Sequence, residues 1–403
     1  MKCKLLIVMM LLALPVAAKK VPKGARLIHA IVKSEMARHP EAWTIDGQQK
    51  PKWNYTQGLE LLGMYGCMSD ANWVRYAKTY TDVLIDSEGH IRGYKKGDFK
   101  LDAINSGKIL FLLYDLTKDE RYKVAMDTLF QQLKEQPRCP EGGFWHKTIY
   151  PHQMWLDGQY MALPFYLEYA RRFLDAEAYQ AVEADVKWRQ LMLIEDKTRC
   201  EECRLLHHAW DAAMVQPWAD KETGQSAHAW GRAEGWYLMA LVDCLDLMFP
   251  DGVPPYGDGT AGGCIPDLLS GQLIHLSARL LELQDEKTGT WQQVLDLTGK
   301  EGNYQEMTCT AMFAYAFLKG ARLGVLEKSY REAAERALKG IRAHFMSVDE
   351  AGLVSLHNCC AVAGLSDTRD GSFEYYLSEP RIDNDPKGIG PLLMALKEYE
   401  LTR

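Results

Sequence analysis

Apolar residues along this chain recur mostly at the spacing of an amphipathic helix. Ile109, Leu112, Leu113 and Leu116 follow the i, i+3, i+4, i+7 pattern that places side chains on one helix face. Strand-like alternation is sparse and short. The pattern predicts helices over these ranges: Gly24–Arg38, Thr56–Gly66, Ala71–Ile85, Asp102–Leu116, Glu120–Glu135, Trp155–Arg172, Ala176–Ile194, Ala227–Met248, Gly262–Gln284, Gln305–Leu323, Lys328–Met346 and Pro391–Tyr399.

The connections between the predicted helices are short and carry Gly, Pro and Asp, as at Pro250-Asp251-Gly252. Richly apolar helices alternate with more charged ones, which is typical of hairpins whose inner helices are covered by outer ones. No low-complexity linker and no fixed-period repeat of the tetratricopeptide kind divides the sequence. We therefore expect one all-α domain over residues 19–403, and a closed α/α toroid rather than an open solenoid.

The first residues, MKCKLLIVMMLLALPVAAKK, have the features of a secretory signal peptide. Lys2 and Lys4 precede an apolar run, and Val16-Ala17-Ala18 offers small residues for cleavage. The run is too short to span a membrane, and no later segment is apolar enough to do so. We expect residues 1–18 to be removed and the protein to be periplasmic or extracellular, without a membrane span.

Charge and cysteine content narrow the function classes. The formal net charge is −7 and no basic stripe is present, which argues against a nucleic-acid partner. Cys200 and Cys203 form a C-x-x-C, but a zinc site of the common type needs a second paired cluster, and none is present. We expect no metal and no cofactor, and mostly buried free thiols with at most a short Cys200–Cys203 bridge.

The densest chemistry lies in residues 139–165, CPEGGFWHKTIYPHQMWLDGQYMALPF. Asp157 lies there among aromatic, imidazole and cationic side chains. Aromatic faces suit the apolar side of a sugar ring, and cations suit an acidic substituent. A carboxyl group that loses hydration favours its protonated form. We therefore predict a carbohydrate-cleaving site with Asp157 as its principal acid; the alternative role is that of a helix N-cap.

Asp102 also opens a predicted helix, where capping is an equal alternative. Its pairing with Asp157 favours a role at the site, because sugar-processing sites commonly need a second carboxylate. In His207-His208, adjacent helical residues point about 100° apart and do not form a metal-binding pair. His208 is instead a candidate hydrogen-bond donor to substrate.

The segment from Trp230 to Trp236 contains Gly231 and Gly235, which weaken a helix by about 1 kcal/mol each relative to alanine. Tight helix packing is one explanation. The functional alternative places Trp230 and Trp236 against sugar and Arg232 on a carboxylate. We favour the functional alternative.

Several motifs together resemble the unsaturated rhamnogalacturonyl hydrolases, glycoside hydrolase family 105. They are GGFWHK, YPHQMWLDGQYM, HHAWD, HAWGRAEGWYLMAL, GTWQQVLD, TAMFAYAFLKG and DGSFEYYLSEPRIDNDPKGIGP, and the resemblance runs from about Trp53 to the C-terminus. It implies an (α/α)6 barrel. It also implies removal of a 4,5-unsaturated uronic acid from the non-reducing end of an oligosaccharide made by a lyase.

The resemblance implies an unusual reaction, in which protonation of C4 of a vinyl ether is followed by addition of water at C5 and collapse of the hemiketal. Asp157 matches the family's general acid/base, and Asp102, in D-x-x-N-S-G, matches its second, substrate-binding aspartate. Further positions match residues that line the sugar subsite: Lys147, His208, Trp230, Arg232, Trp236 and the aromatic Tyr55.

Three functions remain open from the sequence. The first is trimming of unsaturated galacturonyl-rhamnose in pectin breakdown. The second keeps the chemistry but acts on unsaturated glucuronyl ends from ulvan or glycosaminoglycans; we expect the Trp291 loop and Cys200–Cys203 to decide between them. The third is a non-catalytic sugar-binding toroid, against which the presence of both aspartates argues. A sugar epimerase is weaker still, because no histidine pair for proton transfer is evident.

Overall fold

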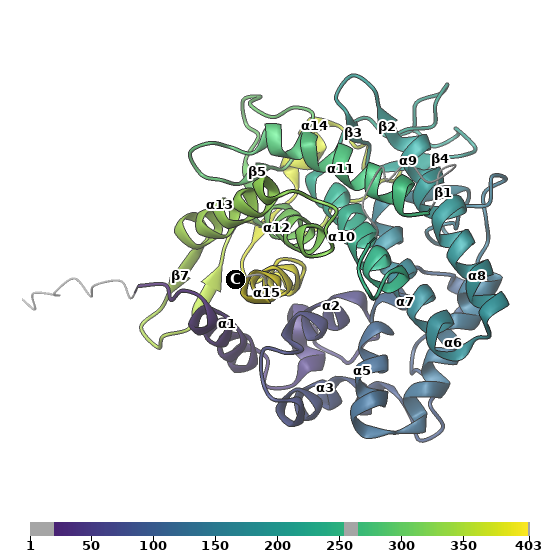
Figure 1. Ribbon diagram of the computed structural model, residues 1–403, viewed down its shortest axis with the longest axis vertical. Coiled ribbons are helices and arrows are strands. Elements are labelled where there is room, and N and C mark those ends of the chain that lie inside the picture. The colour runs from purple at the N-terminus through teal and green to yellow at the C-terminus, as the bar shows by residue number, and fades with distance from the viewer. Residues whose placement is uncertain (1–19, 254–264, 402–403) are drawn as a thin grey trace, which may run out of the picture.

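The computed structural model describes residues 20–253 and 265–401, and within them an inner ring of helices surrounds the axis of the molecule (Figure 1). The last inner helix packs against both the one before it and the first, which closes the ring. The inner helices are α2 (Tyr55–Met64), the pair α4 (Asp102–Asn105) and α5 (Lys108–Thr117), α7 (Leu156–Phe173), α10 (Gly231–Met248), α12 (Met307–Arg322) and α15 (Pro386–Leu401).

A second layer of helices covers the ring from outside (Figure 1). Outer helices bury one narrow stripe, such as Ala333, Ala337 and Ile341 of the outer helix over residues 328–344, whereas α12 is buried almost throughout. The layer consists of α1 (Ala25–Arg38), α3 (Asp70–Leu84), α6 (Glu120–Glu135), α8 (Ala176–Ala184), α11 (Ile265–Leu283) and α13 (Lys328–His344). Two concentric layers make an (α/α)6 barrel, which confirms the predicted fold.

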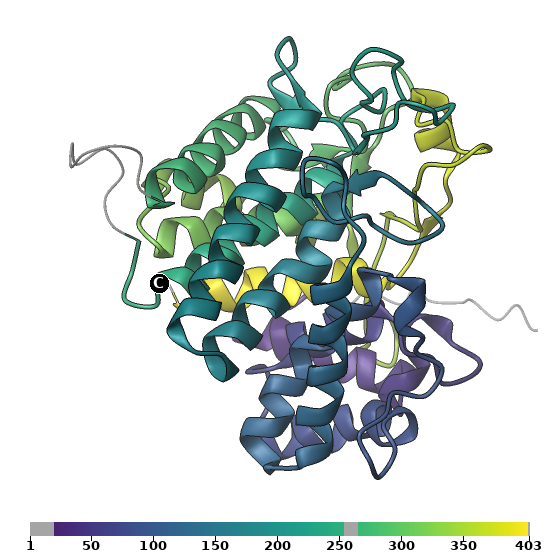
Figure 2. The same ribbon diagram turned by 90° about the vertical axis from the view of Figure 1, so that its right-hand side faces the viewer.

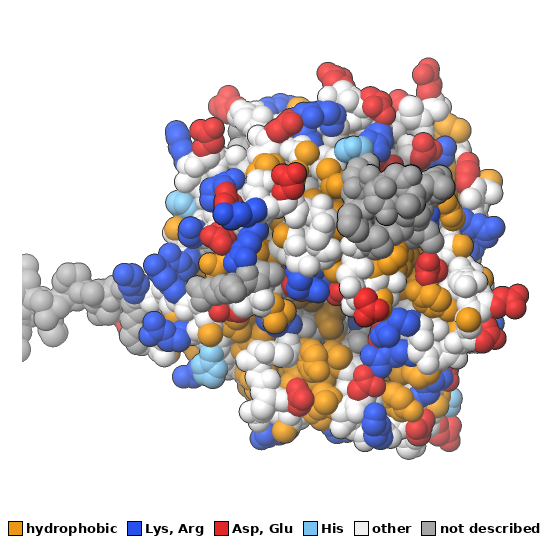
Figure 3. Space-filling model, in the orientation of Figure 1, with side chains coloured by type: hydrophobic (Ala, Val, Ile, Leu, Met, Phe, Trp, Pro, Cys, Tyr) orange, Lys and Arg blue, Asp and Glu red, His pale blue; other side chains and the backbone are white. Residues whose placement is uncertain are grey.

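The predicted signal peptide lies outside the described residues. No helix among the described residues is long and apolar enough to cross a membrane. Acidic and basic side chains are interspersed over the face of the molecule in Figure 3, without a continuous basic stripe on that face.

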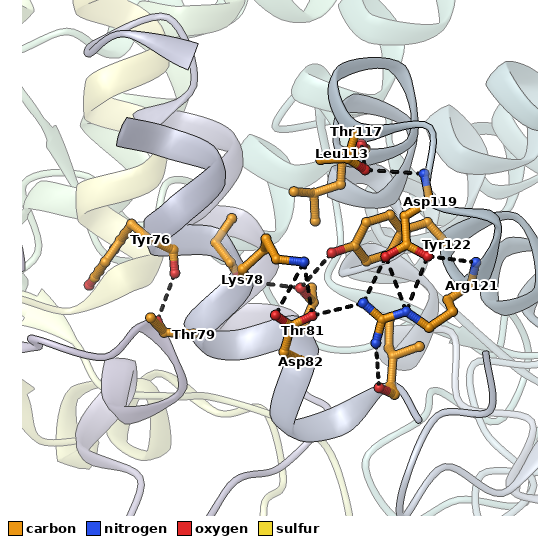
Figure 4. A network of polar contacts seen from close by, with 12 residues as sticks. Tyr76, Lys78, Thr79, Thr81, Asp82, Leu113, Thr117, Asp119, Arg121 and Tyr122 are labelled. Atoms are coloured by element: carbon orange, nitrogen blue, oxygen red, sulfur yellow. Dashed lines mark hydrogen bonds and ion pairs between the residues drawn. The ribbon is translucent and has the colours of Figure 1, made fainter. Parts of the chain in front are cut away.

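Polar contacts tie the outer helices together at the surface, as Figure 4 shows for α3 and α6. Arg121 Nη2 lies 3.1 Å from an oxygen of Asp82 and 2.7 Å from one of Asp119, the residue that caps α6. The hydroxyl groups of Thr81 and Tyr122 lie 3.3 Å apart beneath this network. Because exposed ion pairs contribute little, the network orients helices whose stability comes mainly from the buried core.

Several predicted helix bounds were wrong. The helix predicted from Ala227 begins at Gly231, because Trp230 is extended and pairs with Val294. The last helix begins at Pro386, which suits a first helical position because its missing N–H would be unpaired there in any case. The helix predicted over residues 102–116 is interrupted between α4 and α5. The helix predicted over residues 176–194 comprises α8, a π-helical segment (Asp185–Leu191) and α9 (Met192–Thr198).

The sequence pattern gave little sign of the short strand pairs that connect the helices. β1 leads directly into α7, and the second strand of the β5–β6 pair leads directly into α12, so these pairs lie where inner helices begin. Figure 2 shows the long connections near the end of the molecule at which α15 starts. The pairs are β1 (Gln153–Trp155) with β4 (Ala209–Asp211), β2 (Arg199–Cys200) with β3 (Leu205–Leu206), β5 (Trp291–Gln292) with β6 (Gln305–Glu306), β7 (Met346–Val348) with β8 (Val354–Leu356), and β9 (Cys359–Cys360) with β10 (Arg381–Ile382). A further short helix is α14 (Phe373–Ser378).

Candidate active site

The pairing of β1 with β4 brings Asp157 and His208 together. Trp155 is aligned with Ala209, and the Leu156 N–H donates to the carbonyl of His208 at 3.1 Å. Asp157 follows two residues after Trp155, and His208 precedes Ala209 by one. The antiparallel register therefore places the start of α7 directly beside the histidine.

Asp157 faces His208 without a hydrogen bond of good geometry. Its Oδ2 lies 3.2 Å from His208 Nε2, and this oxygen is buried with no hydrogen-bond partner among the described residues. The Asp157 side chain retains 17% of its surface exposed. The N-cap of α7 is Trp155, so Asp157 does not cap the helix. Buried polar atoms without partners are uncommon, and one on an accessible carboxylate suits a group that acts on substrate.

His208 is itself held from the other side. Its ring is fully buried, and its Nδ1 lies 2.9 Å from the hydroxyl of Tyr376 in α14. Nothing in the sequence indicates that Tyr376 contacts His208, because the two residues are brought together only by the fold. Asp157, His208 and Tyr376 thus form a row of contacts in which a buried imidazole can position the carboxyl group.

Asp102 forms the second acidic point of the site. Lys147 Nζ lies 2.6 Å from its Oδ2, and His146 Nε2 lies 3.4 Å from its Oδ1. Burial alone would raise the pKa of Asp102, but the charge of Lys147, followed by that of His146, holds it below its usual value. The pKa of Lys147 is raised, because Asp102 outweighs the opposing effect of burial. The two groups therefore remain an ion pair at neutral pH.

His146 was not predicted as a site residue, although it lies within the GGFWHK motif. Its pKa falls to about 4 because of burial, so the ring is neutral at neutral pH. The charges of both Asp102 and Asp157 act on it, so His146 lies near both carboxylates. Its Nδ1 is buried and has no hydrogen-bond partner within the part of the chain that the structure describes. His146 connects the two halves of the site.

A wall of parallel rings borders these groups. The ring centroids of His146 and Trp155 are 4.9 Å apart with 1° between the planes, and those of Tyr150 and Trp155 are 5.0 Å apart with 8°. Tyr150 is half-buried, so this wall reaches the surface. Flat aromatic surfaces of this kind suit the apolar face of a sugar ring.

Trp230 lies beside His208, Arg232 lies beside Trp230, and both side chains are deeply buried. Trp230 is 1% exposed, stacks on Tyr376 and lies 4.8 Å from His208 between ring centroids. Arg232, also 1% exposed, donates to the carbonyl of Cys360 and lies 3.7 Å from Glu306. Arg232 thus already has a carboxylate partner within the protein, and its contact with a substrate carboxylate stays a prediction.

Trp236, a predicted sugar contact, and Trp291, whose loop was expected to influence the choice of sugar, both lie in the core. Trp236 is 1% exposed and stacks on Tyr160 at 5.1 Å, because it lies on the face of α10 that packs against α7. Trp291 is fully buried against Phe313, and its indole N–H donates to the carbonyl of Leu280. A sugar contact for Trp236 therefore lacks geometric support, and the Trp291 side chain stabilises the fold, so the influence of its loop on sugar preference stays a prediction.

Tyr55 is half-buried at the first position of α2. Burial raises the pKa of its phenol well above the usual value, and the nearby charge of Asp102 raises it further. The carbonyl of Tyr55 accepts a hydrogen bond from Asn105 at 3.0 Å. Tyr55 therefore lies near Asp102, and its contact with a sugar stays a prediction.

A cavity of about 390 Å³ opens beside Asp102 and Lys147, between residues 51–54 and 92–100. Trp53 and Tyr94 contribute rings, and most of its charged lining is basic: Lys52, Arg92, Lys95, Lys100 and Lys147. A larger cavity, of about 530 Å³, lies between α1 and α3 and contains none of the predicted site residues. The smaller cavity is therefore the one joined to the site.

The described residues contain a single group of at least three side chains whose ligand atoms are close enough to hold a metal, Cys200, Cys203 and His207. Neither Asp102 nor Asp157 belongs to it. What the site at Asp157 offers chemically is a carboxyl group, imidazoles, a cation and aromatic faces.

Comparisons with known proteins fit this arrangement. The sequence profile of Glycosyl Hydrolase Family 88 matches residues 27–402. The solved structure of a glycoside hydrolase of family 105 from C. acetobutylicum ATCC 824 is 37% identical and has a TM-score of 0.82, with 93% of this chain and 99% of that chain covered. The resemblance to family 105 predicted from the sequence is thereby confirmed.

More distant relatives have related names. The unsaturated rhamnogalacturonyl hydrolase YesR of Bacillus subtilis (strain 168) is 24% identical over 312 residues, which are 75% of this chain and 78% of that protein. The unsaturated glucuronyl hydrolase from Bacillus sp. GL1, responsible for the degradation of glycosaminoglycan, is 14% identical with a TM-score of 0.64 over 92% of this chain and 94% of that one. The second likeness shows a shared fold alone.

Proposed function

This chain belongs to Glycosyl Hydrolase Family 88, and we propose that it releases the 4,5-unsaturated galacturonyl residue from the non-reducing end of rhamnogalacturonan lyase products. The observation that carries this proposal is the pair formed by Asp157 and His208. In it, a buried carboxylate oxygen that has no hydrogen bond from any described residue lies 3.2 Å from an imidazole nitrogen. The similarity to YesR supports the choice of sugar.

The chemistry requires one group that first gives and then takes a proton. Asp157, protonated, transfers its proton to C4 of the vinyl ether, and positive charge develops at C5. The resulting Asp157 carboxylate accepts a proton from water as the water oxygen bonds to C5. The hemiketal then opens, the bond to the leaving sugar breaks, and that sugar departs as an alcohol while the uronic acid becomes a keto acid.

The neighbours of Asp157 divide the remaining tasks. His208, held by Tyr376, fixes the orientation of the Asp157 carboxyl group. The ion pair of Asp102 and Lys147 presents an anionic acceptor to sugar hydroxyls and a cation to an acidic group. The half-buried ring of Tyr150, supported from within by Trp155, provides a face for the sugar. The substrate we infer is therefore an acidic oligosaccharide with an unsaturated uronic acid end.

The protein meets this substrate outside the cytoplasm in our proposal, because the first residues have the composition of a signal peptide. Lyase products of pectin would be encountered in the periplasm or the medium. We expect the exported protein to begin at Lys19. A protein that keeps residues 1–18 and stays inside the cell would contradict this proposal.

The function is tested with purified wild type and Asp157→Asn on a panel of lyase-generated disaccharides. Loss of the ultraviolet absorbance of the conjugated double bond is the readout. We expect the fastest loss with unsaturated galacturonyl-rhamnose and a reduction of roughly 10²- to 10⁴-fold for Asp157→Asn. Faster turnover of unsaturated glucuronyl substrates would change the proposed sugar but leave the proposed reaction unchanged. Tight binding without turnover by the wild type would instead favour the non-catalytic alternative.

The exposed residue Asp196, on the outer surface, provides a matched control. Asp196→Asn should retain wild-type turnover. Equal activity of wild type and Asp157→Asn would remove the proposed role of Asp157.

A further inference from the structure

The hairpin formed by β2 and β3 brings two thiols and an imidazole together away from the residues of the proposed mechanism. Cys200 is aligned with Leu205 across the hairpin, and Arg204 at its tip adopts a positive φ of 59° that turns the chain back. One ligand atom from each of Cys200, Cys203 and His207 lies within 4.8 Å of the others. Both cysteines are free thiols.

Two local features of the hairpin suit a bound cation. The backbone N–H of Cys203 donates to the sulfur of Cys200 at 3.2 Å, so the turn directs a backbone dipole at that sulfur. The Nδ1 of His207 is buried and has no hydrogen-bond partner among the described residues, whereas the backbone of Ser226 bonds to the ring. A buried imidazole nitrogen without a hydrogen-bond partner remains available as a metal ligand.

Charge and spacing around the group suit a borderline-soft divalent ion. A tetrahedral zinc ion with bonds of about 2.0–2.3 Å holds its ligand atoms roughly 3.5–3.8 Å apart, so a small closing movement of the present arrangement is sufficient. The negative charge of Asp296 acts on both Cys203 and His207. The opposing cation, Arg279, donates to the carbonyl of Cys203 at 2.9 Å and its neighbour Glu282 at 2.8 Å.

We propose that Cys200, Cys203 and His207 bind one zinc ion, with a water molecule as the fourth ligand, and that this ion fixes the hairpin to the segment between β3 and β4 that carries His208. Two thiolates balance the charge of the ion. Sulfur and imidazole ligands select zinc over magnesium and calcium, which prefer oxygen. His207 directly precedes His208, so the ion holds the backbone next to the candidate acid without taking part in the reaction. This revises the expectation from the sequence, in which the C-x-x-C lacked a partner cluster because His207 was considered only as a neighbour of His208.

The test uses the full chain, reduced, freed of metal by chelation and titrated with cobalt and then zinc. We expect one cobalt ion per chain, a thiolate-to-cobalt charge-transfer band together with visible bands of tetrahedral cobalt, and displacement of both by zinc. Zinc should raise the thermal unfolding midpoint, and magnesium or calcium should not.

Matched variants separate this site from general thiol chemistry. Cys200→Ser and Cys203→Ser should each lose the cobalt bands, whereas Cys67→Ser, which changes another half-buried free thiol, should keep them. His207→Ala should weaken binding, and His29→Ala, on an exposed face of α1, should not. Circular dichroism of each variant identifies loss of fold, and His207→Ala alone suffices if the cysteine variants do not fold.

Absence of the cobalt bands in the reduced wild type would overturn the proposal. So would a Cys200–Cys203 disulfide in the exported protein purified without reductant, found by alkylation and mass spectrometry. Because metal binding is read from spectra and stability, these outcomes do not depend on the activity.

Discussion

Nε2 of His208 lies 3.2 Å from Oδ2 of Asp157, while Nδ1 of the same ring lies 2.9 Å from the hydroxyl of Tyr376. The imidazole therefore connects the candidate acid at the start of α7 to α14, some 220 residues later in the chain. Because the ring is fully buried and Nδ1 is held by Tyr376, His208 cannot turn freely, and its Nε2 stays directed at the Asp157 carboxyl group.

The first prediction concerns the tyrosine. Tyr376→Phe leaves Nδ1 of His208 without its partner, and an unpaired buried polar group costs about 1–3 kcal/mol. We expect kcat/KM to fall roughly 10- to 100-fold, mainly through kcat, with a changed pH profile. Tyr375→Phe is the control, because that hydroxyl bonds Glu379 and Gly364 instead. If both variants kept the wild-type profile, Tyr376 would have no positioning role.

A second prediction concerns the ion pair beside the site. Lys147→Met removes the cation that holds the pKa of Asp102 low, so burial then raises that pKa. We expect a several-fold rise in KM and a shift of the acid limb of the kcat/KM profile to higher pH. Lys134→Met, on the exposed side of α6, should change neither. An unchanged acid limb in Lys147→Met would show that Asp102 does not titrate with activity.

The buried arginine gives a third prediction, about stability. Arg232→Met leaves Glu306, fully buried, without its cation, and breaking a buried pair costs about 3–5 kcal/mol. We expect a matching loss in the free energy of unfolding, measured in urea, and partial recovery in the double variant Arg232→Met/Glu306→Gln. A variant with wild-type stability but a much higher KM would show that Arg232 serves the substrate instead.

Acid should destabilise the protein through His146. Its pKa is about 4 when folded and 6.5 ordinarily, so the unfolded chain binds more protons between these values and stability falls as pH drops from 6.5 toward 4. The full shift corresponds to about 3 kcal/mol. Glu35 and Glu234, with pKa values raised by burial to about 7 and about 8, act in the opposite direction.

The comparison of wild type with His146→Gln isolates the histidine from these acids. The difference in unfolding free energy between the two proteins, measured in urea at pH 7 and pH 4.5, should change in favour of the variant at the lower pH. A difference that stays constant with pH would mean that His146 is not buried in its neutral form.

The basic cavity next to Asp102 predicts a dependence on substrate charge. Lys95→Glu reverses a charge in the cavity lining, so kcat/KM should fall several-fold for longer oligosaccharides with a second acidic sugar and little for the disaccharide. The salt dependence of kcat/KM for the longer substrate should weaken as well. Lys96→Glu is the matched control, because Lys96 pairs with Glu135 and does not line the cavity. An equal loss of kcat/KM on both substrates would show that no second acidic group of the substrate lies in this cavity.

Sequence by itself determined the layered helical architecture and the identity of the candidate acid. The i, i+3, i+4, i+7 pattern depends only on neighbours in the chain, so inner helices such as α12 were identified with small errors at their ends. Asp157 could be found because the aromatic and cationic residues around it are close in sequence, between residues 139 and 165.

Tertiary structure alone decided which side chains meet. Tyr376 and Cys360 reach His208 and Arg232 across more than 125 residues, and no local pattern records such contacts. Trp230 and Trp236 are close in sequence and both are buried, yet Trp230 lies beside His208 and Trp236 stacks on Tyr160. Trp230 is extended and precedes α10, whereas Trp236 lies on the face of α10 that packs against α7. The positions of the aromatic side chains therefore depend on packing between helices, and this packing cannot be inferred from the local sequence.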